Sequence, residues 1–155
     1  MAPEEEGLRA WAALLRTHAA VVPLIDRELQ LAAGLPLAWY DALLELNSAP
    51  QRRLRMTDLG NRVVLSRTRV SRIVDELVGA GFVSRDDNPA DRRSAYAVIT
   101  AEGRRRLRAA APVYRASIDR HFAARLPRAD VARVRMALER VLQAESPPPA
   151  RADKR

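Results

Sequence analysis

Residues 66–72, with the sequence SRTRVSR, combine three arginines and three hydroxyl groups and contain no acidic residue. In a helix, Val70 would share one face with the apolar residues that follow, and the polar residues would fall on the other face. Arginine pairs bidentately with guanine, and serine and threonine donate to bases or phosphates. The segment therefore predicts a helix that reads duplex DNA in the major groove through Ser66, Arg67, Thr68, Arg69, Ser71 and Arg72. The alternative is a solvated charged face.

A second basic group follows about twenty residues later, at Asp91, Arg92 and Arg93, in a stretch rich in turn-forming residues. An arginine at the tip of a hairpin can enter the minor groove, where the negative potential is high. We therefore expect Arg92 and Arg93 to contact DNA, with Asp91 holding the loop through an ion pair. An exposed, salt-bridged turn without function is the alternative interpretation.

The positive charge is concentrated in the middle of the chain. The whole sequence has a net charge of +8, and residues 52–108 contain fourteen Arg and seven acidic residues, a net of +7. A focused basic excess attracts polyanions. Arg-rich composition alone explains why Arg outnumbers Lys, but not why the excess is central. A basic helical protein that binds an acidic protein partner, without sequence-specific DNA binding, remains the alternative function.

The sequence contains few residues that could form a catalytic or metal-binding site. It has no cysteine, and its two histidines, His18 and His121, are about a hundred positions apart. Phosphate-binding glycine loops are absent, so we expect no catalytic residues, no cofactor and no metal. No apolar run approaches the ~18 residues of a membrane span, and residues 1–7 do not resemble a signal peptide. We expect a soluble cytoplasmic protein with no membrane partner.

Helical periodicity dominates the elements that must position these side chains. Apolar steps predict a helix over 8–30, which Pro23 should kink or interrupt, and a second helix over 36–47. A polar turn is expected at 48–55. Capping residues predict a third helix at 58–64 and a fourth from 67 to about 80, which Gly81 ends. A long helix is expected to start at Thr100 and to bend at Pro112, and a last helix is expected at 129–144.

Two short strands around the charged loop predict a hairpin over 82–99, so the expected fold is mainly α with a small β-hairpin, a winged helix-turn-helix. We expect a flexible acidic segment at 1–7, a DNA-binding domain at 35–103 and a flexible tail at 145–155. Residues 8–34 and 104–144 form helices with spare apolar faces. These faces predict a homodimer with two-fold symmetry, and a monomeric bundle that buries them internally is the alternative.

The stretch Asp91–Gly103, DRRSAYAVITAEG, resembles the D-x-R-x3-apolar-x-apolar-T-x2-G signature of MarR-family regulators, and the resemblance covers roughly residues 8–144. Ala97 departs from it, because a larger aliphatic residue is usual there, so we expect a less tightly packed wing strand. The resemblance implies a dimer that binds near-palindromic operators. It also implies a transcriptional regulator, expected to be a repressor with an activator as the alternative, that small aromatic acids release from DNA.

A narrower resemblance concerns the segments LRAWAALLR, GLPLAWYDALLEL and GFVSRDD. They are similar to a MarR subgroup that responds to urate or related purine metabolites. The resemblance implies a ligand site made of Trp11, Asp41, Arg72 and Arg85, in which a flat anion stacks on the indole and is held by the guanidinium groups. The alternatives are that Trp11 belongs to the core, that Arg72 contacts only DNA, that Asp41 pairs with a basic neighbour, or that the ligand is another phenolic or carboxylic acid.

Overall fold

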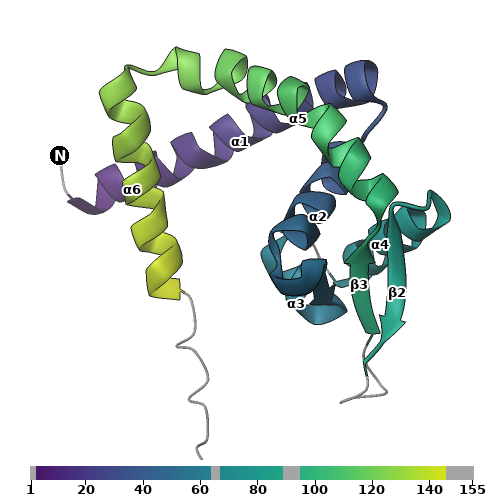
Figure 1. Ribbon diagram of the computed structural model, residues 1–155. Coiled ribbons are helices and arrows are strands. Elements are labelled where there is room, and N and C mark those ends of the chain that lie inside the picture. The colour runs from purple at the N-terminus through teal and green to yellow at the C-terminus, as the bar shows by residue number, and fades with distance from the viewer. Residues whose placement is uncertain (1–2, 64–66, 89–94, 146–155) are drawn as a thin grey trace, which may run out of the picture.

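The computed structural model describes residues 3–63, 67–88 and 95–145 (Figure 1). Its helices and strands follow one another in the order expected for a winged helix-turn-helix. They are α1 (Pro3–Ala33), α2 (Leu37–Ser48), η1 (Pro50–Arg52), β1 (Arg53–Arg55), α3 (Met56–Arg62), α4 (Arg67–Gly79), β2 (Val83–Asp87), β3 (Ala95–Ile99), α5 (Ala101–His121), η2 (Ala123–Arg125) and α6 (Arg128–Glu145). The three strands form one antiparallel sheet in the order β1-β3-β2.

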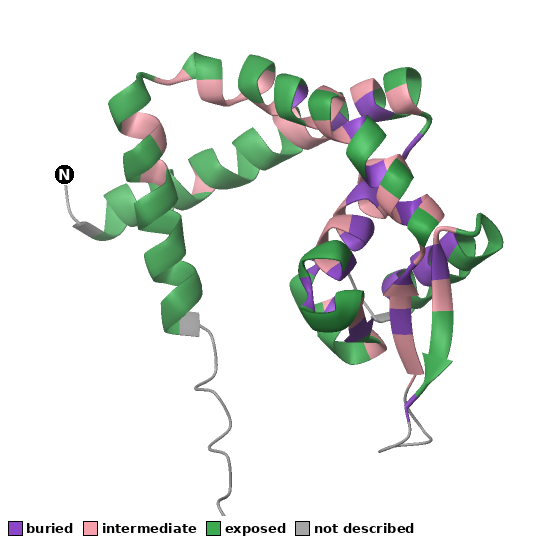
Figure 2. Ribbon diagram, viewed as in Figure 1, coloured by how far each residue is buried: buried purple, intermediate pink, exposed green. Residues whose placement is uncertain are grey.

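The hydrophobic core lies at one end of the molecule, where α2, α3 and α4 pack with the sheet and with the adjoining parts of α1 and α5. Figure 2 shows the buried residues gathered there, whereas α6 and the first half of α1 are largely exposed. The largest apolar side chains that are completely buried are Leu29, Leu35, Leu43, Leu46, Leu59, Val74 and Leu77. Burial of these aliphatic groups provides the main stabilisation of the domain.

The end of α4 and the start of α5 meet at Phe82. Gly81 has φ +76°, and the amide of Phe82 donates to the Leu77 carbonyl, which ends α4 as the sequence predicts. Thr100 accepts from the Gly103 amide as the N-cap of α5, and its hydroxyl donates to the Gly81 carbonyl. A Cβ at Gly103 would overlap the Phe82 carbonyl oxygen. The threonine and glycine of the family signature therefore join the helix-turn-helix to α5.

Helix α1 differs from the sequence prediction at its start, and it is not interrupted at Pro23. The helix begins at Pro3, so residues 4–7 are helical rather than a flexible lead, and Glu4–Glu6 lie in the first turn, where the helix dipole favours negative charge. The helix also continues through Pro23 without a break. Because proline has no amide hydrogen, Pro23 leaves the carbonyl of Ala19 without its helical partner. Both residues are exposed, so water can satisfy that carbonyl. The helix α5 likewise runs through Pro112.

The segment 48–55 is more than the expected polar turn. It contains η1 and the strand β1, in which Leu54 pairs with Ala97 of β3. Both side chains are buried, 6% and 0% exposed respectively. Ala97, the residue that departs from the family signature, therefore lies opposite Leu54 in the sheet. Arg53 stacks on the Tyr96 ring in the same sheet, 4.6 Å from its centroid.

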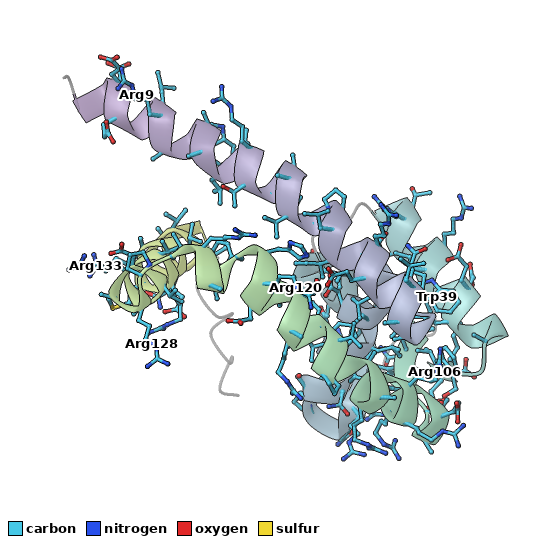
Figure 3. The ribbon with its side chains drawn as sticks, turned by 90° about the horizontal axis from the view of Figure 1, so that it is seen from above. Arg9, Trp39, Arg106, Arg120, Arg128 and Arg133 are labelled. Carbon is cyan, nitrogen blue, oxygen red and sulfur yellow. The ribbon has the colours of Figure 1, made fainter. Side chains whose placement is uncertain are left out.

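Apolar side chains remain exposed along the first half of α1 and along α6. They are Leu8, Trp11, Leu14 and Leu15 on α1, and Met136, Leu138, Val141 and Leu142 on α6. Figure 3 shows α6 lying apart from the first half of α1 rather than packing on it. Over the described residues, a single chain thus does not form the monomeric bundle considered as an alternative. By length and composition alone α1 also meets the criterion for a membrane span. Its second half, however, places Ile25 and Leu29 in the core.

The close approach at Gly103 gives a stability prediction. Gly103→Ala should lower the free energy of unfolding by about 2 kcal/mol, because the new methyl group forces the Phe82 carbonyl away from α5. Urea denaturation followed by circular dichroism measures the change. Gly79→Ala is the matched control, since nothing lies within 4 Å of its added methyl group, and its stability should be unchanged or raised by up to about 1 kcal/mol. Equal stability of the two variants would contradict the close approach.

Candidate nucleic-acid interface

The first turns of α4 present polar side chains to solvent. Thr68, Arg69, Ser71 and Arg72 are exposed, whereas Val70 is 3% exposed and packs in the core with Ile73, Val74 and Leu77. The predicted division of this helix into a core face and an outer face is confirmed. Ser66, the side chain of Arg67, and the loop residues Asp91, Arg92 and Arg93 lie outside the described residues. The proposed role of all these residues in DNA binding stays a prediction.

Farther along α4, two acidic residues pair with arginines. Glu76 accepts a hydrogen bond from Nε of Arg72 at 3.1 Å and another from the indole Nε1 of Trp39 at 3.0 Å. The bond from Trp39, together with that from Arg72, holds the pKa of Glu76 below its usual range. One residue earlier, Asp75 accepts from Nη2 of Arg85 on β2 at 2.6 Å. Ion pairs thus fix the second half of α4 to its own first half and to the wing.

The wing is an antiparallel hairpin beside α4. In the register between β2 and β3, Val83 lies opposite Ile99 and Asp87 opposite Ala95. Val83 and Ile99 are buried, whereas Arg85, Asp86 and Asp87 are exposed. The inner end of the hairpin is therefore part of the core, and the outer end of β2 is exposed to solvent. Figure 1 shows β2 and β3 extending away from α5.

A groove of about 860 Å³ runs between α1, α2 and the start of α4. Its charged and polar lining includes His18 and Asp26 from α1, Asp41 and Glu45 from α2, Arg62 and Arg69 from the helix-turn-helix, and Tyr114 from α5. Asp26 accepts from the Leu37 amide at 2.8 Å and so caps α2 from eleven residues away. The groove therefore touches both the long helices and the helix with the exposed basic face.

Asp41 is the most perturbed acid in the groove. Burial, together with the negative charge of Glu45, raises the pKa of Asp41 to about 6. Burial also raises the pKa of Tyr114, whose ring packs on Tyr40 with 4.3 Å between centroids. The tyrosine therefore stays a neutral phenol that can donate or accept a hydrogen bond. Cations, a phenol and a protonatable carboxyl together form a surface suited to a polar aromatic ligand.

The four residues predicted for the effector do not all line the groove. Asp41 lines the groove, but Arg72 pairs with Glu76 and Arg85 with Asp75. Trp11 is 59% exposed on the distal half of α1, which excludes a core position within one chain. The arginine of α4 that does line the groove is Arg69.

Sequence reasoning missed His18, Arg62 and Tyr114 as groove residues, although one signal was available. His18 falls four residues before Val22 and seven before Ile25, on the same stripe of α1. Arg62 and Tyr114 come from other helices, and only the packing of those helices reveals them. Among the described residues, no group of three or more acidic, histidine or cysteine side chains could hold a metal ion.

Comparison with known proteins agrees with this architecture. A family model described as MarR family matches residues 33–94. The chain is 33% identical over 88 residues to the HTH-type transcriptional regulator YkoM of Bacillus subtilis and 32% identical over 72 residues to PapX of Escherichia coli. These alignments cover 56% and 46% of this chain and span about half the length of the two relatives, 55% and 44%.

A solved structure gives a fuller match. The chain is 31% identical to Sco3205, a MarR family transcriptional regulator from Streptomyces coelicolor whose crystal structure is in complex with DNA. The superposition has a TM-score of 0.81 and covers 99% of this chain and 95% of that protein. The likeness therefore includes the long helices α1, α5 and α6 as well as the helix-turn-helix.

The raised pKa of Asp41 predicts a pH-dependent effect on stability. Because its folded pKa of about 6 exceeds the ordinary value of 3.8, ionisation destabilises the fold as pH rises between these values. Asp41→Asn should therefore raise Tm at pH 7.5 by roughly 2–4 °C, the effect of about 1 kcal/mol after allowance for partial exposure. Below pH 3.8 the gain should vanish.

Differential scanning fluorimetry across pH measures this effect. Asp119→Asn is the matched control, since it removes an exposed carboxyl group from α5. A pH-independent gain in the Asp41 variant, or the same profile in both variants, would contradict a destabilising charge at Asp41.

Proposed function

Because this chain belongs to the MarR family of transcriptional regulators, we propose that it acts in the cytoplasm as a homodimeric repressor that a small anionic aromatic ligand releases from DNA. It acts by binding and not by catalysis. In this proposal α4 enters the major groove of each half of a near-palindromic operator, and the wing reaches the adjacent minor groove. One observation carries the proposal: the exposed first turns of α4 are basic and hydroxyl-bearing and contain no acid.

The charge distribution supports DNA as the partner. Thr68, Arg69, Ser71 and Arg72 are exposed at the amino-terminal part of α4, and the acids of that helix begin only at Asp75, where they are paired with arginines. Phosphates are attracted to the basic turns and to the helix dipole. Sco3205, which is similar over nearly the whole chain, is itself described in complex with DNA.

The exposed apolar faces support a homodimer. Trp11 and Leu15 on α1 and Val141 and Leu142 on α6 are each at least half exposed in a single chain. Large contiguous apolar patches are rarely left in water, and a two-fold interface made by the terminal helices would cover both sets. In such a dimer, two copies of α4 face the same side of the duplex, which suits a near-palindromic site.

The groove beside Asp41 supports a small anionic aromatic ligand, either a purine such as urate or a phenolic acid. Arg62 and Arg69 supply guanidinium groups, and Tyr114 and His18 supply rings and hydrogen-bonding groups. Its volume of about 860 Å³ lies within the usual range for ligand pockets. Trp11 lies outside this groove in its own chain, so its proposed part in ligand binding requires a second copy.

The central experiment is a mobility-shift assay on the DNA upstream of the protein's own gene, repeated with urate, xanthine and salicylate. Specific binding should weaken steeply with salt, with a log–log slope near −0.9 for each phosphate neutralised. It should exceed binding to random duplex by about 10³-fold or more. Equal binding to every duplex, with the same salt slope, would favour a basic protein that binds an acidic partner.

Arg69→Ala tests the reading helix. The variant should bind operator roughly tenfold more weakly and with relaxed base preference, because a bidentate base contact contributes about 1–3 kcal/mol to discrimination. Fluorescence anisotropy with operator and random duplexes measures both effects. Arg128→Ala is the matched control, because it removes the same charge from the start of α6. The Arg128 side chain points away from the body of the molecule in Figure 3. Equal affinities of the two variants for operator and for random duplex would contradict a base contact by Arg69.

Trp11→Ala tests the effector hypothesis. The variant should keep its affinity for operator but require a higher ligand concentration for release, since the indole would no longer stack on the ligand. Titration of ligand into the protein–operator complex gives the midpoint. Leu14→Ala, an exposed apolar residue of the same helix, controls for a weakened dimer. A midpoint equal to that of the parent for urate, xanthine and salicylate would remove Trp11 from the ligand site.

A further inference from the structure

One carboxylate on α4 joins the reading face of the helix to its neighbour α2. Glu76 uses Oε1 to accept from Arg72, one turn earlier on the same helix, and Oε2 to accept from the indole of Trp39 on α2. Both distances, 3.1 Å and 3.0 Å, are ordinary for hydrogen bonds. Because both oxygens are used, the carboxylate has a defined orientation, and it transmits that orientation to the Arg72 side chain.

Trp39 is itself fixed on its other side. The rings of Trp39 and Phe82 pack edge to face, with 6.1 Å between centroids and 80° between planes. The guanidinium of Arg106 lies over the Phe82 ring at 5.6 Å and donates from Nη2 to the Ala33 carbonyl at 2.9 Å. Figure 3 shows Trp39 and Arg106 at the same end of the molecule. The indole is therefore an anchored donor rather than a mobile surface group, so it can hold Glu76 in place.

The geometry leaves Arg72 able to contact DNA while it is held. Its side chain is 82% exposed, against 41% for Glu76. The pair forms through Nε, and a guanidinium has four further N–H donors on its two terminal nitrogens. Those terminal nitrogens form the fork that matches a guanine edge or a phosphate. An unrestrained exposed arginine would lose more conformational freedom when it binds a base, so restraint favours binding in one register.

We propose that Glu76 and Trp39 are positioning residues for operator recognition, which hold Arg72 in the orientation that reads the base sequence. The inference rests on the proposed function of α4 in DNA binding and adds residues that sequence reasoning did not select. It also explains an acid on a helix that approaches phosphates. The carboxylate of Glu76 weakens the attraction of α4 to any duplex. It also restricts the orientation of Arg72, and so the base sequences that Arg72 can bind well.

The test compares operator with random duplex, using a duplex selected by the parent protein from a randomised pool. Glu76→Gln removes the charge and one acceptor, and Trp39→Phe keeps an aromatic ring against Phe82 but removes the indole donor. Asp75→Asn is the matched control, because it removes a neighbouring charge that pairs with Arg85 instead. Anisotropy titrations at several salt concentrations give affinities for both duplexes, and melting curves confirm that each variant is folded.

Glu76→Gln and Asp75→Asn should both tighten binding to random duplex at low salt, since each removes a negative charge. Only Glu76→Gln and Trp39→Phe should lower the ratio of operator to random affinity, by about tenfold, the discrimination that one bidentate base contact provides. In an Arg72→Ala background, Glu76→Gln should cause no further loss of this ratio, because the residues act through the same contact.

Two results overturn the inference and are distinguishable. If the parent prefers its selected duplex but Glu76→Gln keeps the same preference as Asp75→Asn, the positioning role is wrong and the proposed function stands. If the parent prefers no duplex, the proposed function fails and the inference fails with it. Should Trp39→Phe not fold, the pair of Glu76→Gln and Arg72→Ala variants decides the outcome alone.

Discussion

The carbonyl of Phe82 accepts a hydrogen bond from the Thr100 amide, and its ring lies against Trp39 and Arg106. The end of α4, the start of β2 and the start of α5 therefore meet at a single residue. Gly103 allows α5 to approach this point because any side chain there would overlap the Phe82 carbonyl. Since packed interiors do not deform continuously, the direction of α4 relative to α5 is set here. The placement of the basic face of α4 and of the wing depends on this contact.

Charge along α4 is ordered as well as positive. The first turns carry arginines and hydroxyl groups, and the acids Asp75 and Glu76 follow, each paired with an arginine. In the proposed function, attraction to phosphates comes from the first part of the helix, whereas the second part holds the side chains of Arg72 and of Arg85 on the wing. Exposed ion pairs contribute little to stability. The role we assign to these pairs is therefore to restrict conformation, and Glu76 does this most directly because the anchored indole of Trp39 holds its carboxylate.

Much of the fold could be predicted because its signals are local. Gly81 and Thr100 mark helix ends by their own backbone and side-chain chemistry, and the core face of α4 follows from apolar spacing. The continuity of α1 through Pro23 was not predictable in this way, since it depends on exposure of the affected carbonyl. The strand β1 was missed because three residues carry too short an alternation, and only pairing with β3 defines it.

The candidate sites were predicted less completely for the same reason. Asp41 lines the groove, but the arginine of α4 that accompanies it is Arg69 and not Arg72. Choosing between two arginines three positions apart requires the rotation of α4 against α2, which spacing within α4 does not contain. The bond between Trp39 and Glu76 spans 37 positions and depends on the same packing.

Arg69 is both exposed on the reading helix and part of the groove lining, so the two proposed ligands share one guanidinium. An anion in the groove that engages Arg69 lowers its availability to DNA, and by linkage DNA lowers the affinity of the groove for that anion by the same factor. The protonation state of Asp41 also affects the binding of an anion in the groove. Its pKa of about 6 leaves it mostly ionised at neutral pH, where its charge opposes an anion in the same groove. In the proposed function, protonation of Asp41 would remove that repulsion, so anion and proton would bind cooperatively and such a ligand would release DNA more effectively as pH falls.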